Sequence, residues 1–310
     1  MIRTPASTPV AAAALVAFGA LAPAPATAQE PPLETFRIGI MGGENEADRL
    51  RNFQCLVDSL PEAIGVEEVA LFPAADYDGV IQGLLGGTLD YAELGASGYA
   101  KIYLEDESAM EPVLTTVQTD GSTGYHSVMV AREDSGMTEL ADMRGKRLGF
   151  ADPDSTSGFL VPNVSLPGAI GAPVDEFFAE TGFGGGHENL VLEVVKGRFD
   201  AGTTWASGVG DFDDGYSSGN LRKMVDKGIL DMDELVELWR SPLIPNGPIV
   251  VRSTLDEGIK ERFVAFMKAL PESDPDCFSA IQGGEYDDFT EVTPEFYETI
   301  IDARRSIVGG

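Results

Sequence analysis

The sequence predicts an α/β protein built as two lobes, with a hinge between them and a ligand cleft where they meet. The chain of 310 residues alternates strand-like and helix-like runs along most of its length. Two loop-like stretches, residues 119–124 and 241–248, bracket a central block of the same α/β character. Hydrophobic residues make up 43% of the chain, which is enough to form packed cores. We therefore expect residues 29–122 and 246–310 to form one lobe and residues 123–245 to form the other.

The first 28 residues predict an export signal peptide. Arg3 is the only charged residue among them, and the apolar run over residues 10–21 is too short to span a bilayer. Ala26, Thr27 and Ala28 fit the small-x-small pattern of a cleavage site. We expect cleavage after Ala28 and a soluble mature protein in an exported compartment, most simply a periplasm. A disordered apolar tail is the alternative.

The first lobe opens on three strand–helix pairs. Short apolar runs predict strands at residues 36–41, 69–72 and 89–94. Apolar residues at helical spacing predict helices after each of them, at residues 44–60, 77–85 and 98–104. Strands and helices in this alternation form a sheet sandwiched by helices.

The second lobe repeats this organisation and then returns the chain to the first. Strands are expected at residues 125–131, 147–150, 200–203 and 235–239. A helix is expected after Ser155, and Pro162 would keep its first segment short or kinked. The chain then closes with a strand at residues 249–251 and helices at residues 254–270 and 293–307.

The two cysteines, Cys55 and Cys277, are too far apart in the sequence for a CxxC redox pair or a cysteine-rich zinc site. On a helix over residues 44–60, Cys55 falls opposite the apolar stripe of Leu50, Phe53, Val57 and Leu60. A cysteine off the core in an oxidising compartment could bridge to Cys277. Two free thiols are an equal alternative.

The charge balance excludes some classes of partner. The chain has 21 Lys and Arg against 51 Asp and Glu, a formal net charge of -30. Nucleic-acid binding rests on basic side chains that neutralise phosphates, so this balance argues against it. An anionic membrane surface would repel the protein as well. The acidic surface itself mainly indicates solubility.

The strongest local signal is the segment from Asp152 to Pro162, which follows a strand and opens a helix. Ser155, Thr156 and Ser157 place three hydroxyl groups at that helix start, where backbone N–H groups have no acceptor within the helix. Together these donors can hold a tetrahedral oxyanion despite the acidic surface, because salt screens long-range repulsion within about 10 Å. An ordinary N-cap and turn is the alternative.

Other candidate residues lie at strand ends and helix starts. His187 follows a glycine run near an expected helix start and could donate to an anion; a solvent-facing loop histidine is the alternative. His126 lies in a strand and favours a structural role. Tyr77 begins a helix and Trp205 follows a strand, so both could face a cleft or pack in a core. Two histidines without HExxH spacing make a metal site improbable.

Five segments in order carry a family resemblance. They are residues 75–83, 120–127, 154–162, 186–188 and 241–245. With them the chain resembles the periplasmic phosphonate-, phosphite- and phosphate-binding proteins of ABC importers, over most of residues 36–270. The resemblance implies the two-lobed periplasmic-binding-protein type II architecture.

The resemblance also implies the site residues and partners. Ser155, Thr156, Ser157 and His187 would bind the phosphonate oxygens, and Tyr77 and Tyr125 would assist from the other lobe and the hinge. Trp205, Ser207 and Asn246 are further candidates. The partners would be a small phosphorus oxyanion and an inner-membrane ABC permease, with no cofactor and no nucleic acid, and we expect a monomer.

The chain differs from some members of the family at the positions that would bind an amino group of the ligand. Relatives that bind 2-aminoethylphosphonate use two carboxylates for the amine, and the aligned positions here are Ser207, or its neighbours, and Gly247, which carry no charge. Asp211, Asp213 or Asp214 could substitute through a loop shift. Otherwise an ammonium group would be buried without a partner, which is costly. The sequence therefore favours phosphate, phosphite or a simple alkylphosphonate.

Two other functions share this scaffold. A ligand sensor for a membrane kinase would have a similar site, and an enzyme would need an activated nucleophile or an acid–base pair in the cleft. The sequence shows no GxSxG, Walker or dinucleotide motif, and no convincing nucleophile beside a base. We therefore expect binding without catalysis.

Overall fold

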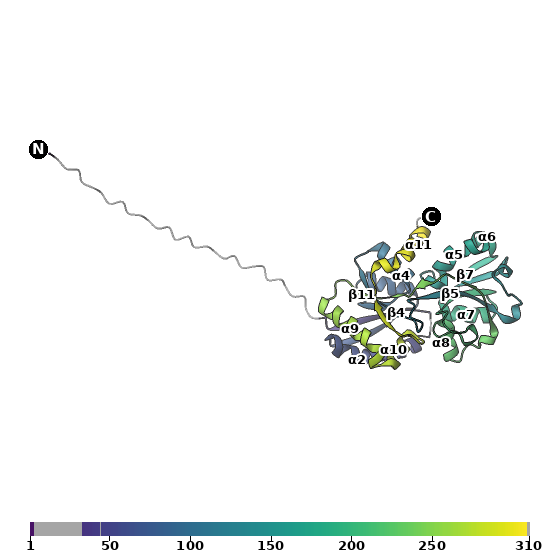
Figure 1. The fold of residues 1–310 in the computed structure, drawn as a ribbon, viewed down its shortest axis with the longest axis horizontal. Helices are drawn as coiled ribbons and strands as arrows, with labels where there is room; N and C mark the ends of the chain where they lie inside the picture. The colour runs from purple at the N-terminus through teal and green to yellow at the C-terminus, as the bar shows by residue number, and fades with distance from the viewer. Residues whose placement is uncertain (3–32, 44, 309–310) are drawn as a thin grey trace. The chain divides into compact units, whose positions relative to one another are not determined.

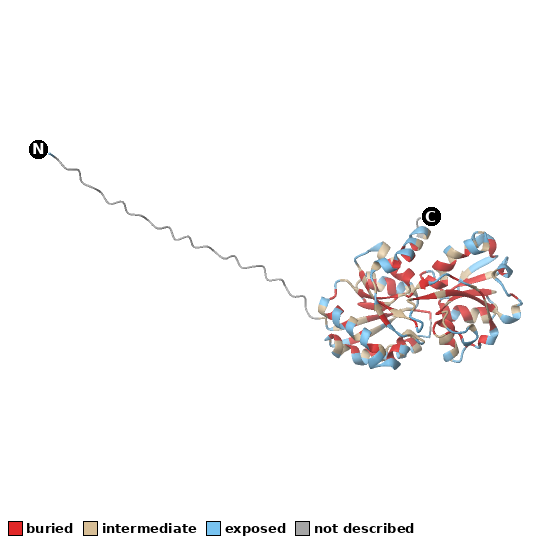
Figure 2. Cartoon of the chain, in the orientation of Figure 1, coloured by how far each residue is buried: buried red, intermediate tan, exposed pale blue. Residues whose placement is uncertain are grey.

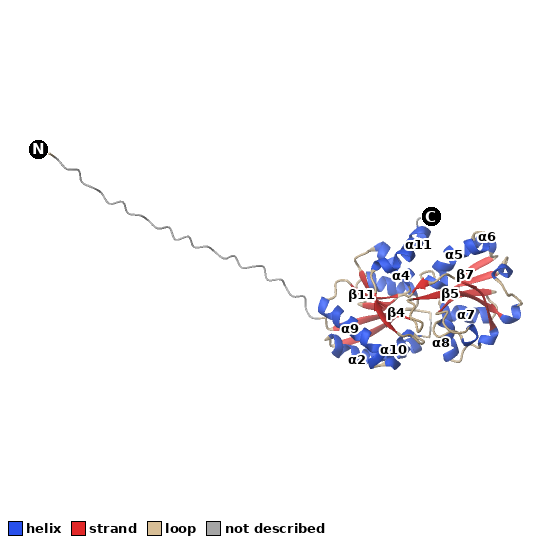
Figure 3. Ribbon diagram, in the orientation of Figure 1, coloured by secondary structure: helices blue, strands red, loops and turns tan. Residues whose placement is uncertain are grey.

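The computed structural model describes residues 1–2, 33–43 and 45–308. The predicted cleavage site, and all but the first two residues of the predicted signal peptide, lie outside the described residues. Residues 33–308 form two β-sheets covered by helices, which confirms the α/β class (Figure 1, Figure 3). Figure 2 shows that the buried residues concentrate on the strands and on the inner faces of the helices.

The first sheet has the strand order β12-β4-β11-β3-β1-β2. In it β1 pairs in parallel with β2 and β3, and the other pairings are antiparallel. Its strands are β1 Thr35–Ile40, β2 Glu68–Pro73, β3 Tyr91–Glu93, β4 Met110–Val117, β11 Pro248–Arg252 and β12 Asp288–Glu291. Every one of them comes from residues 35–117 or 248–291.

Alternation along these strands divides the core of the first sheet between its two faces. Ile249 and Val251 enter one cluster and Val250, between them, enters the other. The first cluster packs beneath α2 Gln54–Ile64, α9 Glu257–Ser273 and α10 Pro275–Gln282. The second packs beneath α3 Tyr77–Leu85, α4 Ala96–Glu105 and α11 Glu298–Val308.

The second sheet has the order β10-β5-β8-β6-β7, with β9 also paired to β5. Its strands are β5 Gly124–Arg132, β6 Arg147–Phe150, β7 Glu180–Phe183, β8 Ala201–Ala206, β9 Leu235–Arg240 and β10 Ile244–Pro245. Its helices are α5 Val161–Ile170, α6 Val174–Phe177, α7 His187–Val195 and α8 Asn220–Asp226. Short 3-10 turns occur at η1 Glu133–Ser135, η2 Leu140–Met143, η4 Phe212–Asp214, η5 Met232–Glu234 and, near the first sheet, η6 Pro294–Tyr297.

The chain crosses between the sheets at residues 118–123 and 246–247, and the two crossings lie side by side. The backbone N–H of Asn246 donates to the carbonyl of Thr123 at 2.9 Å. The hydroxyl of Thr115 donates to the carbonyl of Asn246 at 3.0 Å. Paired crossings of this kind form a hinge about which two lobes can close.

The expected helix over residues 44–60 is wrong in one respect, because Phe53 divides it. The structure has α1 Glu46–Asn52 followed by α2, and the break resets the angular phase of the core stripe. The buried stripe of α2 is Leu56, Leu60 and Ile64. Cys55 lies beside that stripe, half-buried against the core, rather than opposite it. Of the two alternatives for the cysteines, the structure contains the Cys55–Cys277 disulfide.

Candidate ligand-binding site

A cavity of about 240 Å³ lies between the two lobes, with lining residues from both. Its lining includes eight of the nine ligand-binding candidates named from the sequence: Tyr77, Tyr125, Ser155, Thr156, Ser157, His187, Trp205 and Asn246. The ninth, Ser207, is not part of the described lining; its hydroxyl accepts from the backbone N–H groups of Val209 and Ser218. Asp211, Asp213 and Asp214 are exposed and do not line it either, so the idea that they replace the amine carboxylates is wrong.

The hydroxyl cluster stands at the end of β6, where open α/β sheets bind ligands. Ser155 is the N-cap, and its hydroxyl accepts from the backbone N–H of Gly158 at 3.0 Å. A π-helical turn, Thr156–Leu160, precedes α5, and Pro162 lies in the first turn of α5. Proline is tolerated there because the N–H that it lacks would have no acceptor. The expected short first segment is therefore confirmed.

Two hydroxyl side chains of the second sheet donate to backbone carbonyls of this turn. The hydroxyl of Ser127 donates to the carbonyl of Ser157 at 2.6 Å, and the hydroxyl of Thr203 donates to the carbonyl of Gly158 at 2.9 Å. Because these carbonyls are occupied, the side of the turn that lines the cavity offers hydroxyl and N–H donors to a ligand.

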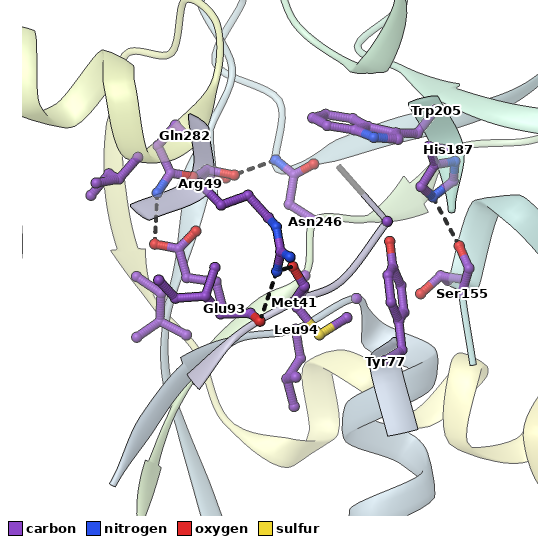
Figure 4. Close-up of a pocket in the computed structure, with 18 of the residues that line it drawn as sticks. Met41, Arg49, Tyr77, Glu93, Leu94, Ser155, His187, Trp205, Asn246 and Gln282 are labelled. Carbon is purple, nitrogen blue, oxygen red and sulfur yellow. Dashed lines mark hydrogen bonds between the residues drawn. The ribbon is translucent and has the colours of Figure 1, made fainter. Parts of the chain in front are cut away.

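His187 is the first residue of α7 and lies beside the hydroxyl cluster (Figure 4). Its Nε2 is 3.0 Å from the hydroxyl of Ser155, and its Nδ1 is 3.2 Å from the hydroxyl of Thr204. The structure thus corrects the expectation that no hydroxyl nucleophile has a base beside it. The Nδ1 of His187 contacts the Thr204 hydroxyl, at the nitrogen where a catalytic triad has a carboxylate.

Two tyrosines face the same cavity from other elements. Tyr77 is the first residue of α3, which Asp76 caps by accepting from the backbone N–H of Gly79 at 2.9 Å. The ring of Tyr125 packs edge-on against Trp205, with 6.1 Å between ring centroids. Burial raises the pKa of Tyr125, against hydrogen bonds with Ser157 and Thr156 that lower it. Its hydroxyl therefore stays protonated and can donate.

The turn that carries Ser155, Thr156 and Ser157 also contacts the first lobe. Asp154 forms ion pairs with Lys101 of α4, at 2.8 Å, and with Arg304 of α11. The hydroxyl of Thr156 accepts from the backbone N–H of Ser97 at 2.8 Å. Gly186, which precedes His187, lies against Gly43 so closely that a Cβ on it would stand 2.3 Å from the Gly43 Cα. The two lobes thus touch around the cavity.

Sequence reasoning missed several lining residues of the cavity, namely Arg49, Glu93, Lys223, Gln282 and Tyr286. Figure 4 shows Glu93 and Gln282 on one side of the view and Ser155 and His187 on the other. A usable signal existed for Glu93, since it is a lone acidic residue at the carboxyl end of a predicted strand. Arg49 and Lys223 lie on helices and gave no local signal.

Glu93 is held in place by neutral donors. Its Oε1 accepts from the Tyr91 hydroxyl and from the Gln282 amide, both at 2.9 Å. Burial raises the pKa of Glu93 to about 7, although these hydrogen bonds and the charge of Lys223 act to lower it. At neutral pH this carboxyl group therefore carries only part of a negative charge.

No group of three or more His, Cys, Asp or Glu side chains within the described residues could hold a metal ion. In the same part of the chain, no helix has the length and apolar character needed to cross a membrane.

Two lobes with a hinge, closing on a small cavity lined by hydroxyl and imidazole donors, define the class of solute-binding receptors. The family model described as the periplasmic phosphonate substrate-binding protein of ABC transporters matches residues 38–297. The chain belongs to this family of periplasmic binding proteins. It is therefore the solute-binding component of an ABC importer, located in the periplasm, and not an enzyme.

Individual relatives agree with this assignment. The phosphonates-binding periplasmic protein of Escherichia coli is 31% identical over 250 residues, which cover 79% of this chain and 68% of the relative. The phosphate-import protein PhnD of Mycolicibacterium smegmatis is 30% identical over 253 residues, which cover 79% of this chain and 74% of the relative.

Solved structures share the fold. A binding-protein component of an ABC phosphonate transporter from Pseudomonas aeruginosa superposes with a TM-score of 0.73 at 23% identity, covering 90% of this chain and 89% of that one. The PhnD1 protein of Prochlorococcus marinus, solved in complex with methylphosphonate, superposes with a TM-score of 0.72 at 17% identity, covering 88% and 98% of the two chains. These likenesses confirm the two-lobed binding-protein architecture expected from the sequence.

Proposed function

We propose that Ser155, Thr156, Ser157 and His187 bind the phosphorus oxyanion head group of the ligand, assisted by Tyr77 and Tyr125. The observation that carries this proposal is the convergence of three hydroxyl groups and an imidazole on one cavity wall, with the carbonyls of the turn occupied behind it. Hydrogen bonds to an ionised acceptor are stronger than neutral ones, and a dry cavity strengthens them further. Neutral donors of this kind suffice for a phosphonate dianion.

The cavity favours ligands without an amine. Ser207 and Gly247 supply no carboxylate, and Glu93, an acidic residue that lines the cavity, has a pKa raised to about 7 by burial. Lys223 lines the same region and would repel an ammonium group. The ligand class that fits is therefore phosphate, phosphite or a phosphonate without an essential amine.

In the transport cycle that this function implies, residues 33–122 with 246–308 form one moving body and residues 123–245 the other. The ligand would close the two bodies about the crossings at residues 118–123 and 246–247, and the closed form would dock on the inner-membrane permease. The protein would act as a monomer after cleavage behind Ala28, and its net charge of -30 argues against nucleic acid as a partner.

Calorimetric titration of the ligand-free protein tests the site. The ligands are phosphate, phosphite, methylphosphonate, 2-aminoethylphosphonate and sulfate. We expect saturable heat with at least one phosphorus ligand, and its loss in the Ser155→Ala/Thr156→Ala variant. The control is Ser59→Ala/Ser306→Ala, which removes two exposed helical hydroxyls outside the cavity. Unaltered affinity in the first variant would refute the site, and preference for the aminated ligand would refute the ligand class.

A further inference from the structure

Arg49 is a buried cation that no described acidic residue neutralises. Its side chain lines the cavity and the residue is 8% exposed. Its Nη1 donates to the carbonyls of Met41 at 2.5 Å, Ala74 at 3.2 Å and Ile40 at 3.3 Å. Its Nε is buried without a hydrogen-bond partner. Arg49 forms no ion pair among the described residues, although the neighbouring Arg51 does.

A buried guanidinium is expensive unless an anion accompanies it. Backbone carbonyls satisfy one nitrogen of Arg49 but supply no net negative charge. Nη2 has no hydrogen-bond partner among the described residues and, unlike Nε, is not among their buried unpaired atoms; the side chain to which it belongs lines the cavity. The guanidinium thus has unused donor capacity and an unbalanced charge beside an open space that can admit an anion.

Two other lining residues, Lys223 and Glu93, bear on the charge of the ligand that the cavity can hold. Lys223 of α8 reaches it from the second lobe, with its ammonium 5.5 Å from the Trp205 ring centroid. Glu93 is the one acidic residue of the described lining, and neutral donors already occupy its Oε1. Arg49 and Lys223 are thus two of the chain's 21 Lys and Arg, and both line this cavity although the chain has 51 Asp and Glu.

We propose that Arg49 and Lys223 form a second anion subsite, and that the preferred ligand is a phosphonate that carries a carboxylate. This inference rests on the proposed function, because the hydroxyl cluster must hold the phosphonate end. A carboxylate fits because it can accept from Nη2 of Arg49, the nitrogen that the carbonyls leave unused, and because the Lys223 ammonium can join as a point charge. The cavity volume of about 240 Å³ restricts the ligand to short molecules such as phosphonoacetate or 3-phosphonopropionate.

Titration calorimetry on the wild-type protein gives the first test, with methylphosphonate, phosphonoacetate and 3-phosphonopropionate as ligands. Charge-assisted hydrogen bonds to the added carboxylate should make at least one carboxylated ligand bind about tenfold or more tightly than methylphosphonate. Arg49→Gln should abolish this advantage and Lys223→Gln should reduce it, because each substitution should weaken the carboxylated ligand more than methylphosphonate. Arg51→Gln, on the same helix with a side chain 70% exposed, is the matched control and should keep the advantage.

The outcomes separate the two hypotheses. If no phosphorus ligand binds, the proposed function fails and this subsite fails with it. If methylphosphonate binds but neither carboxylated ligand binds more tightly, the subsite alone is refuted. It is also refuted if Arg49→Gln weakens methylphosphonate as much as phosphonoacetate, because Arg49 would then hold the phosphonate itself. Should Arg49→Gln fail to fold, the wild-type comparison and Lys223→Gln decide.

Discussion

Asp154 connects the turn that carries Ser155, Thr156 and Ser157 to the opposite lobe, and Asp154→Asn measures what that connection contributes to stability. The residue is 5% exposed and immediately precedes Ser155. Its carboxylate pairs with Lys101 at 2.8 Å and with Arg304, which is itself 8% exposed. Asparagine keeps the size of the side chain and one acceptor oxygen, so the substitution removes the charge with little change in shape.

The expected loss follows from the burial of the two cations. Removing one partner of a buried ion pair costs about 3–5 kcal/mol, because the other charge stays buried without compensation. Arg304 falls in this regime, whereas Lys101 is partly exposed and keeps Asp78 as a second partner at 2.7 Å. We therefore expect the free energy of unfolding to fall by about 3 kcal/mol, the low end of that range. Ligand affinity should fall about tenfold, since a turn released from its anchor must be ordered again on binding.

Urea unfolding followed by circular dichroism measures the stability change, and calorimetric titration with the tightest phosphorus ligand measures the affinity. Asp134→Asn is the control, because it breaks a pair with Arg132 in which the aspartate side chain is 78% exposed. It should change neither quantity. A stability loss below about 1 kcal/mol for Asp154→Asn would mean that the pair behaves as an exposed one, and would refute the reasoning from burial.

Three further predictions concern closure, protonation and the disulfide. Gly186→Ala should lower ligand affinity at least tenfold by calorimetry, because its Cβ would stand 2.3 Å from the Gly43 Cα. The control is Gly185→Ala in the same loop, whose Cβ would meet nothing within 4 Å and which should leave affinity unchanged. Since the pKa of Glu93 rises from 4.5 to about 7 on folding, the folded state binds more protons between these values, and stability falls as pH rises through them. Glu93→Gln should therefore raise the unfolding free energy at pH 8 by up to about 3 kcal/mol and leave it unchanged at pH 4. Equal effects of the substitution at both pH values would contradict the raised pKa of Glu93. Reduction of the disulfide, whose cysteines are 222 residues apart, should lower the unfolding free energy by about 3 kcal/mol in urea titrations. Ligand affinity should stay constant, because neither cysteine lines the cavity.

Strands rich in apolar residues could be predicted from the sequence, whereas β4 could not. The run at residues 125–131 predicted β5 almost to its ends, and the run at residues 69–72 predicted β2. β4 was missed because its eight residues include a proline, a glutamate and two threonines. Its place in the sheet comes from antiparallel pairing with β11 and β12, which lie far along the chain. Such pairing is a tertiary effect that local propensity does not contain.

The candidate site divides in the same way. The hydroxyl cluster is contiguous in the sequence, and its chemistry depends on local backbone geometry at the start of a helix, so residues 155–157 alone suggested an oxyanion site. Arg49, Glu93 and Lys223 come from α1, β3 and α8, and none has a neighbour in sequence that shares its role. Their role depends on which groups surround them after folding; for Arg49, the described residues supply backbone carbonyls and no acidic partner.

The net charge of the molecule and the charge of its cavity have different effects on an anionic ligand. A charge of -30 spread over the surface sets solubility and long-range repulsion, which salt weakens beyond about 10 Å. An anion inside the cavity responds instead to the groups in contact with it, where screening is weak and each oriented donor counts. Among the described residues, the lining there has hydroxyls, an imidazole, a guanidinium and an ammonium, and one carboxyl group, that of Glu93, whose pKa burial raises to about 7. An acidic protein can therefore hold an anion, provided that its few cations and neutral donors are placed at the cavity and its acids elsewhere.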